Sequence, residues 1–421
     1  MTGPRALRAL AAPVLLLVIG GATSRGARDE TPPVVARSAL PGAALNTLTQ
    51  EGMRLYAAGQ FARACERFGQ AWERDPASAT GRADVARCFE GWGWDTLRHG
   101  RPEEAMLLFR QGLRMGPDSP ALLRGLGLAA IHAGRADEAL APLEAAARSG
   151  EDTEVRVLLA NLYDRRDDGG RALEHLRAAL TADPDHAAAR RLADKVERQT
   201  RAETGFQREI TPHFVVKWRA DLDVSWRRAL LAGLDEARER VVGQLGEAPA
   251  EPVTVVLYEA AAFREVARVH AWVSGLFDGK IRLPAGGQLP TRREMARILA
   301  HEYAHAVVHD LTRGRAPRWL HEGLAQALEG ATVDPLLRVP GRPTLTGLEE
   351  MLGNPDPGRA RTGYDIAHWV VQDLLDRGGM PAMRTFMARL RRGDAIAVAV
   401  PAVYGLRLAE LEHQWRRVLG G

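Results

Sequence analysis

The C-terminal half of the chain contains the sequences HEYAH at residues 301–305 and WLHEG at residues 319–323. Residues four apart share one face of a helix, so a helical HEYAH stretch projects His301 and His305 side by side. Two imidazoles held in this way can ligate one metal ion at about 2.0–2.1 Å. Glu302 lies one position further round the helix and faces the open coordination position. The spacing therefore predicts a metal-binding helix with an adjacent carboxylate base.

A returning helix is expected to supply the third ligand. Thr291 followed by Glu294 has the spacing of a capping box, which predicts the start of the metal-binding helix. Beyond the second histidine this helix continues for about six residues, a rise of about 9 Å. Pro317 suits the first turn of the next helix, which brings Glu322 back to the level of the histidines. Two histidines, one glutamate and a water form the open arrangement of catalytic zinc sites.

Two other histidines are weaker candidates for the third ligand. His309 shares the face of His305 but lies a further turn away, and no glycine break follows His305 to bring a third histidine back. His321 adjoins Glu322 but points about 100° away on a helix, which favours a surface or substrate-facing position. The simplest alternative is a coincidental helix rich in His and Glu that binds no metal.

These motifs resemble those of the gluzincin metallopeptidases, specifically the peptidase-MA-like domains that often accompany tetratricopeptide repeats. The resemblance extends over roughly residues 206–419, and its further matching stretches are residues 213–216, 253–258, 279–284 and 411–415. It implies an α+β zincin-like fold and a zinc-dependent peptidase. In such an enzyme His301, His305 and Glu322 bind Zn²⁺ and Glu302 is the catalytic base. The interval from His305 to Glu322 is slightly shorter than in the best-known gluzincins.

Supporting residues are expected downstream of the third ligand. Related enzymes stabilise the carbonyl oxyanion with a tyrosine or histidine from this region, which makes Tyr364 the candidate catalytic donor. A tyrosine that packs on the core at the start of a helix is the alternative. Metal-bound histidines normally donate their other ring nitrogen to an acceptor. Gln326, one turn after Glu322, could supply its amide oxygen.

A repeat occupies residues 45–200. Its first alanines are spaced by 41, 34 and 33 residues, at Ala64, Ala105, Ala139 and Ala172. A 34-residue helix-turn-helix period is the tetratricopeptide signature, and the longer first interval fits two extra helical turns. About four such repeats are enough to stack an α-helical solenoid. Resemblance to such repeats implies a peptide or protein partner, and a structural spacer is the alternative.

The N-terminus has the features of an export signal. A basic start, an apolar core and small residues predict a signal peptide at residues 1–22, followed by a disordered linker at residues 23–44. A periplasmic or secreted protein is expected, with an uncleaved membrane anchor as the alternative, although the apolar run is short for a stable span. The net charge is +4, and without a basic patch interleaved with aromatics, nucleic-acid binding is not expected.

The two cysteines, Cys65 and Cys88, both lie within the repeats. An exported chain could pair them. The favoured interpretation is that both are unpaired, buried small residues.

Residues 205–421 are predicted to form the peptidase domain. Strands are expected at residues 214–218 and 253–258 with a helix over 224–245 between them. A third strand at residues 280–283, stopped by Pro284, is expected at the sheet edge, where a peptide can add through main-chain hydrogen bonds. An ordinary core strand is the alternative. Further helices are expected at residues 345–352, 364–375, 380–390 and 406–419.

Together these patterns predict an exported zinc metallopeptidase whose repeat domain recruits or positions a peptide or protein substrate. Glu302 would take a proton from the attacking water and deliver it to the leaving amine. One alternative is a repeat-based interaction scaffold whose C-terminal domain binds zinc without activity. Another is an esterase or other metal hydrolase on the same fold.

Overall fold

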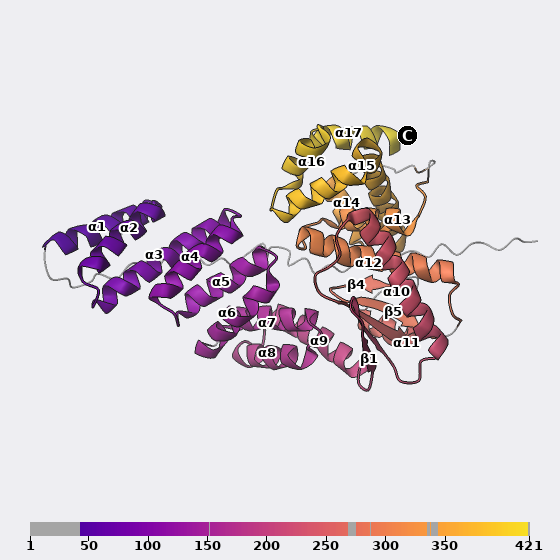
Figure 1. Cartoon of the computed structure of the whole chain (residues 1–421), viewed down its shortest axis with the longest axis horizontal. Coiled ribbons are helices and arrows are strands. Elements are labelled where there is room, and N and C mark those ends of the chain that lie inside the picture. Colours follow the sequence, from indigo (N-terminus) through magenta and orange to yellow (C-terminus); the bar gives the residue numbers. More distant parts are fainter. Residues whose placement is uncertain are drawn as a thin grey trace, which may run out of the picture. The chain divides into compact units, whose positions relative to one another are not determined.

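The structure is a computed structural model (Figure 1) and describes residues 43–150, 152–267, 275–286, 288–334, 337 and 344–419. The predicted signal peptide and nearly all of the predicted linker lie outside these residues. The chain divides into two compact units, whose boundary in the sequence falls between Glu197 and Arg198. Every helix among the described residues is too short or too polar to serve as a membrane span.

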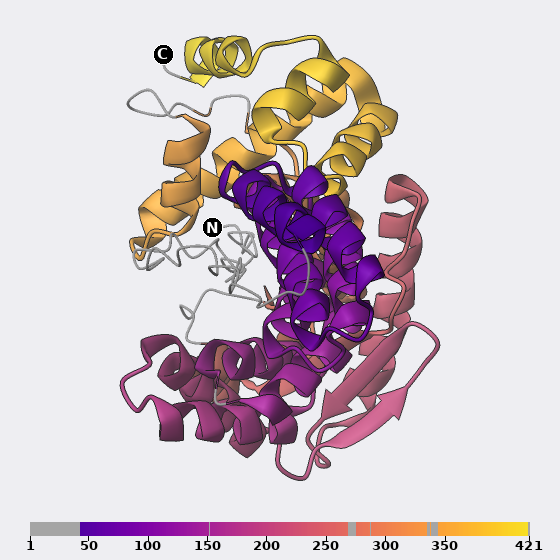
Figure 2. The ribbon, with the colours of Figure 1, turned by 90° about the vertical axis from the view of Figure 1, so that its left-hand side faces the viewer.

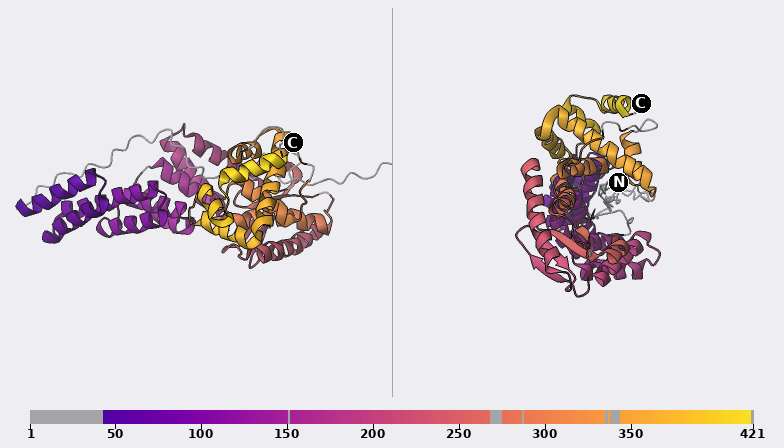
Figure 3. Two further views of the ribbon diagram at one scale, coloured as in Figure 1. Left: turned by 90° about the horizontal axis from the view of Figure 1, so that it is seen from above. Right: turned by 90° about the vertical axis from the view of Figure 1, so that its right-hand side faces the viewer.

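The N-terminal unit is built from successive helix pairs followed by a single helix, as the repeat pattern predicts (Figure 3). The pairs are α1 (Ala43–Ala57) with α2 (Phe61–Arg74), α3 (Ala79–Arg98) with α4 (Pro102–Met115), α5 (Pro120–His132) with α6 (Ala136–Ser149), and α7 (Thr153–Arg165) with α8 (Gly169–Ala182), and α9 (Ala187–Ala202) follows. Helix α3 has 20 residues whereas α5 has 13. This difference accounts for the longer first repeat interval.

The repeated small residues lie where helices touch. The alanines of the motif are all fully buried, at 0% exposure: Ala64, Ala105, Ala139 and Ala172. The large apolar residues four positions later are buried as well: Phe68, Phe109, Leu143 and Leu176. A Cβ placed on Gly127 would clash with the Leu143 side chain, so α5 and α6 approach too closely for any larger residue there. The predicted α-helical solenoid of paired helices is confirmed.

A disulfide joins the first two repeats, and the favoured interpretation of two unpaired cysteines was wrong. Cys65 on α2 and Cys88 on α3 are bonded, with their Cα atoms 5.5 Å apart. Both side chains are buried, as the sequence indicated. Periodicity predicts that two positions face the interior, but it does not predict that they face each other across adjacent helices.

The C-terminal unit contains a small mixed sheet with the strand order β1-β2-β3-β5-β4. Its strands are β1 (Gln207–Ile210), β2 (Phe214–Trp218), β3 (Val253–Glu259), β4 (Leu276–Phe277) and β5 (Ile281–Ala285). The three inner strands β2, β3 and β5 are parallel, and the edge strands β1 and β4 are antiparallel to their neighbours. The two longer predicted strands are confirmed.

The prediction for the third strand was wrong in two respects. β5 is an inner strand with β3 on one side and β4 on the other, so the edge beside it belongs to β4. Pro284 does not stop β5 but pairs with Tyr258 inside it. Within the residues that the structure describes, β4 pairs with Ile281 and Arg282 of β5.

Helices surround this sheet, with the C-terminal helices at one end of the unit and the strands at the other (Figure 2). They are α10 (Val224–Leu245), α11 (Ala260–Ala267), α12 (Arg292–Thr312), α13 (Arg318–Glu329), α14 (Leu345–Leu352), α15 (Pro357–Arg391), α16 (Ile396–Tyr404) and α17 (Leu408–Leu419). α10 and α12 run side by side (Figure 1). Their residues Leu234 and Tyr303 share one core with Val216 and Val255 of the sheet. The sheet thus supports α12, the predicted metal-binding helix.

The C-terminal helices differ in part from the prediction. α15 begins at Pro357, seven residues before Tyr364, because Asp356 caps it by accepting from the Arg359 N–H at 2.8 Å. The two helices expected at residues 364–375 and 380–390 are confirmed, since the non-helical Gly379, whose φ is 63°, divides α15 into two helical stretches. Helix α16 was not predicted. Its nine residues, IAVAVPAVY, have no polar positions to mark a helical period.

Candidate metal centre

Helices α12 and α13 bring together the three predicted ligands. One ligand atom from each of His301, His305 and Glu322 lies within 4.8 Å of the others. The Glu322 Oε2 atom is 3.6 Å from His301 Nε2 and 3.7 Å from His305 Nε2. All three side chains are buried, at 2% exposure or less. Two imidazoles and a carboxylate thus converge on one small volume.

The hairpin that produces this convergence is specified locally. The capping box predicted at Thr291 and Glu294 is present at the start of α12. The helix ends with Arg313 and Gly314 in the left-handed region, at φ 53° and 70°. The Thr312 hydroxyl donates to the Val308 carbonyl at 2.7 Å. The chain therefore turns sharply enough for α13 to return along α12.

The start and the spacing of α13 depend on neighbouring helices. Pro317 is the N-cap residue and provides no side-chain cap. Instead the Trp319 N–H donates to Glu349 Oε1 on α14 at 3.0 Å. A Cβ on Gly323 would clash with the Ala367 carbonyl of α15. Glycine beside the third ligand therefore allows α15 to press directly on α13 and fix the height of Glu322.

The electrostatics of the cluster favour a cation. Burial alone would lower the pKa of His301, but Glu322 and Glu329 outweigh it and raise that pKa to about 10. Burial and the charge of His301 hold the pKa of His305 well below its usual range. Among the described residues, neither ring nitrogen of His305 has a hydrogen-bond partner. Buried imidazole nitrogens without partners beside a carboxylate fit a divalent metal with nitrogen and oxygen ligands.

Glu302 lies beside the three ligands in the environment expected of a base. It is 1% exposed, and burial raises its pKa to about 8, with Glu322 and Glu329 contributing and His301 opposing. A Cβ on Gly275 would lie 2.5 Å from Glu302 Oε1. The backbone immediately before the edge strand β4 therefore approaches this carboxylate closely.

Tyr364 lies on another helix, within range of the charges of Glu322 and Glu302. It lies on α15, is 2% exposed, and its hydroxyl has no hydrogen-bond partner within the described ranges. Burial raises its pKa well above the usual range, and the charges of Glu322 and Glu302 add to this. The residue packs in the main core of the unit as well. It can therefore combine the two roles considered from the sequence.

Glu329 was missed, and the prediction for Gln326 was wrong. The Glu329 Oε2 atom lies 3.3 Å from His301 Nδ1. Gln326 instead donates its amide nitrogen to the Tyr364 carbonyl at 2.8 Å and to the Glu322 carbonyl at 3.4 Å. Glu329 follows Glu322 by seven residues, which is two helical turns on the same face. That spacing is the signal by which the residue could have been found.

Other histidines occupy the surroundings of the centre. His321 is fully buried rather than surface-exposed, and burial lowers its pKa to about 3. Its ring centroid is 5.7 Å from that of His305 on α12, so the expected surface position was wrong, whereas the alternative of a substrate-facing position stays a prediction. His309 contacts Phe277, with centroids 6.0 Å apart, and is not part of the cluster. His368, one turn after Tyr364, is 4% exposed and was not predicted.

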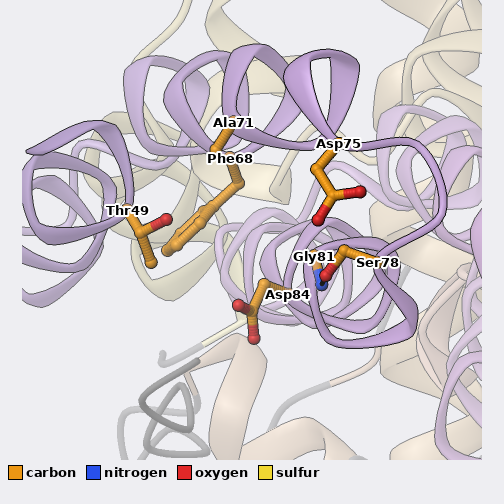
Figure 4. A pocket seen from close by; sticks show the side chains of 7 residues that line it. All are labelled: Thr49, Phe68, Ala71, Asp75, Ser78, Gly81 and Asp84. Atoms are coloured by element: carbon orange, nitrogen blue, oxygen red, sulfur yellow. Dashed lines mark hydrogen bonds between the residues drawn. The ribbon is translucent and has the colours of Figure 1, made fainter. Parts of the chain in front are cut away.

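Two cavities elsewhere offer less chemistry. The first lies among α1, α2 and α3, with Phe68 and Thr49 at one end and Asp75 at the other (Figure 4). Its volume of about 10 Å³ is room for about one water molecule. Asp84 in its wall is 2% exposed. Burial raises the pKa of this carboxyl to about 6, and Arg87 at 3.2 Å opposes the shift.

The second cavity, of about 250 Å³, lies at the carboxyl ends of β2, β3 and β5. Its charged groups are already engaged. Arg219 pairs with Asp221 and with Glu259, and Asp223 caps α10. The centre on α12 and α13 is therefore the stronger candidate for a functional site.

Comparisons with known proteins concern the repeats. The family model for the tetratricopeptide repeat matches residues 90–152, so the chain contains such repeats. Similar solved structures include a mutant of MamA, at 20% identity over 37% of this chain and 88% of its own, with a TM-score of 0.29. A tetratricopeptide repeat protein from Parabacteroides merdae is 11% identical over 83% of this chain and 99% of its own, with a TM-score of 0.35. YrrB, described as a TPR protein with an unusual peptide-binding site, is 17% identical over 34% and 89%, with a TM-score of 0.25. No curated protein matches the chain.

Proposed function

We propose that the C-terminal unit is a zinc-dependent peptidase of the gluzincin type. The observation that carries the proposal is the convergence of His301, His305 and Glu322, all buried, with Glu302 beside them. A His₂Glu set leaves a fourth position open, which distinguishes catalytic from structural zinc sites. Zinc supplies Lewis-acid chemistry, which makes a water molecule acidic enough to lose a proton near neutral pH.

Glu302 is the general base in this proposal. Its carboxylate accepts a proton from the attacking water and then donates it to the leaving amine. Burial raises the pKa of Glu302 in the metal-free site, and a bound cation would oppose this shift and favour the deprotonated form that a base requires. Tyr364 donates its otherwise unpartnered hydroxyl to the oxyanion that develops on the scissile carbonyl.

Substrate alignment is assigned to the edge strand β4. It is the outer neighbour of β5, and the residue before it, Gly275, lies so close to Glu302 that an added Cβ would be 2.5 Å from Oε1. An extended peptide can add to a sheet edge through main-chain hydrogen bonds. Main-chain hydrogen bonds do not depend on the identity of the side chains, so we expect modest sequence selectivity.

The repeat unit is proposed to recruit a peptide or protein. Solenoids of this type present an extended concave surface suited to such partners. We also propose that the protein is exported to the periplasm or secreted. Two observations support this: the signal-like N-terminal sequence and the Cys65–Cys88 disulfide, since disulfides persist in oxidising compartments.

The alternative is an interaction scaffold whose C-terminal unit binds zinc without turnover, which the repeats favour. Wild type and Glu302→Gln should each bind one zinc, but only wild type should cleave a peptide library. Glu350→Gln, an exposed glutamate on α14, is the matched control and should cleave as wild type does. If neither wild type nor the control cleaves any peptide while zinc is bound, the scaffold function replaces the peptidase.

A further inference from the structure

The strand beside Glu302 is short. In the part of the chain that the structure describes, β4 has two residues, Leu276 and Phe277, which pair with Arg282 and Ile281 of β5. Strands of globular proteins usually have about three to ten residues. The β4–β5 turn, in which the Asp278 N–H donates to the Lys280 carbonyl at 3.2 Å, passes through Gly279 at φ 100°. Buried packing of Leu276 and Phe277 and restraints at this turn together can fix the position of β4 against Glu302.

A buried ion pair supplies such a restraint at the turn. Arg282 Nε on β5 donates to Asp278 Oδ1 at 3.1 Å, and their side chains are 1% and 6% exposed. The same guanidinium donates to the Tyr258 hydroxyl and, at 3.4 Å, to Glu203 Oε1. Lys217 and the Tyr258 hydroxyl also donate to Glu203. Two cations, two carboxylates and a phenol thus form one buried polar network.

The network connects the sheet to two segments outside its ladder, one after α9 and one in the β4–β5 turn. Glu203 directly follows α9, whereas Lys217, Tyr258 and Arg282 lie on the inner strands β2, β3 and β5. Asp278 is the member that belongs to the turn. Buried ion pairs add little net stability compared with apolar packing, but they can specify one geometry among several. The network is thus suited to setting a position rather than to holding the fold together.

We propose that Asp278, held by Arg282, is a positioning residue that fixes β4 against Glu302 and so pre-organises the substrate edge of the cleft. This inference rests on the proposed peptidase function for its catalytic consequence. Misplacement of a reacting group by about 1 Å can cost on the order of 100-fold in rate. Asp278 contacts no reacting atom and acts only through the strand that follows Gly275.

The test is Asp278→Asn in the full-length, zinc-loaded protein, with amide hydrogen exchange followed in peptides that cover residues 275–281. Exchange there should accelerate by about 10-fold or more, with α10 unchanged and one zinc retained. The kcat for peptide cleavage should fall about 10- to 100-fold, with KM changing less. Asp278→Glu keeps the charge and should restore part of both losses. If the asparagine variant does not fold, exchange and kcat measured in Asp278→Glu test the proposal in its place.

The matched control is Glu203→Gln, which removes a carboxylate from the same network at a position away from the turn. It should leave exchange over residues 275–281 within about 3-fold of wild type. The inference would be overturned if Asp278→Asn kept the exchange rate and the kcat of wild type. Equal acceleration of exchange over residues 275–281 in Asp278→Asn and Glu203→Gln would overturn it as well. If wild type cleaves no peptide but Asp278→Asn still loosens β4, the peptidase function fails and the positioning role stands.

Discussion

Removal of the disulfide should destabilise the first two repeats by a calculable amount. The cysteines are 23 residues apart in sequence. Loop-closure entropy for a cross-link of that span amounts to about 3.4 kcal/mol at 25 °C. This free energy corresponds to about a 300-fold change in an equilibrium constant. The double substitution Cys65→Ala and Cys88→Ala should therefore lower the amide protection factors of α2 and α3 by about that factor.

Hydrogen exchange measured by mass spectrometry resolves where this loss occurs. Repeats contact only their neighbours, so α8 serves as an internal control and should keep its protection. A reducing agent added to wild type should reproduce the effect, provided that it reaches the buried sulfurs. Two free thiols in the unfolded, unreduced chain would show that the disulfide is absent and would remove one support for export. An equal loss of protection in α8 would show that the effect is not confined to the first repeats and would also refute the reasoning.

Three further predictions concern single side chains. Glu329→Gln removes the carboxylate 3.3 Å from His301 Nδ1 and should weaken zinc binding about 10- to 100-fold in a chelator competition; unchanged affinity would contradict the orienting role. Tyr364→Phe should lower kcat about 100- to 1,000-fold with zinc content and melting temperature unaltered, because its buried hydroxyl has no partner among the described residues; wild-type kcat would exclude it as the oxyanion donor. Asp84 has a pKa raised to about 6 from 3.8, so the folded state binds more protons than the unfolded state between these values. The stability of the first repeats should therefore fall by up to about 3 kcal/mol as pH rises from about 3.8 to 6. Asp84→Asn should abolish this dependence in pH-dependent denaturation, and an identical profile in the variant would contradict the assignment.

The repeat and the ligand hairpin were predictable because each depends on short-range periodicity. Alanines 33 to 41 residues apart report the close crossing of helices, whatever surrounds them. The spacing of His301 and His305 fixes a shared face on any α-helix. The capping box at Thr291 likewise depends on residues three apart. These features need no knowledge of the rest of the fold.

The features that sequence reasoning missed depend on contacts between distant segments. His321 is buried, with its ring 5.7 Å from that of His305, a contact between two separate helices. β5 is an inner strand because β4 pairs with its outer side. The sequence did not predict this because the two residues of β4 are too few to leave a periodic signal. Glu329 rather than Gln326 lies beside His301, with its Oε2 atom 3.3 Å from Nδ1, whereas the Gln326 amide nitrogen donates to the Tyr364 carbonyl. The burial of His321 and the position of β5 depend on which surfaces meet, whereas the seven-residue spacing from Glu322 to Glu329 is a local signal.

The central claim is that His301, His305 and Glu322 hold one zinc ion together. Anomalous diffraction at the zinc edge, from crystals of the zinc-loaded protein, tests it most directly. We expect one strong peak about 2.0–2.2 Å from His301 Nε2, His305 Nε2 and the Glu322 carboxylate. A zinc-saturated crystal with no peak among these three side chains would contradict the claim.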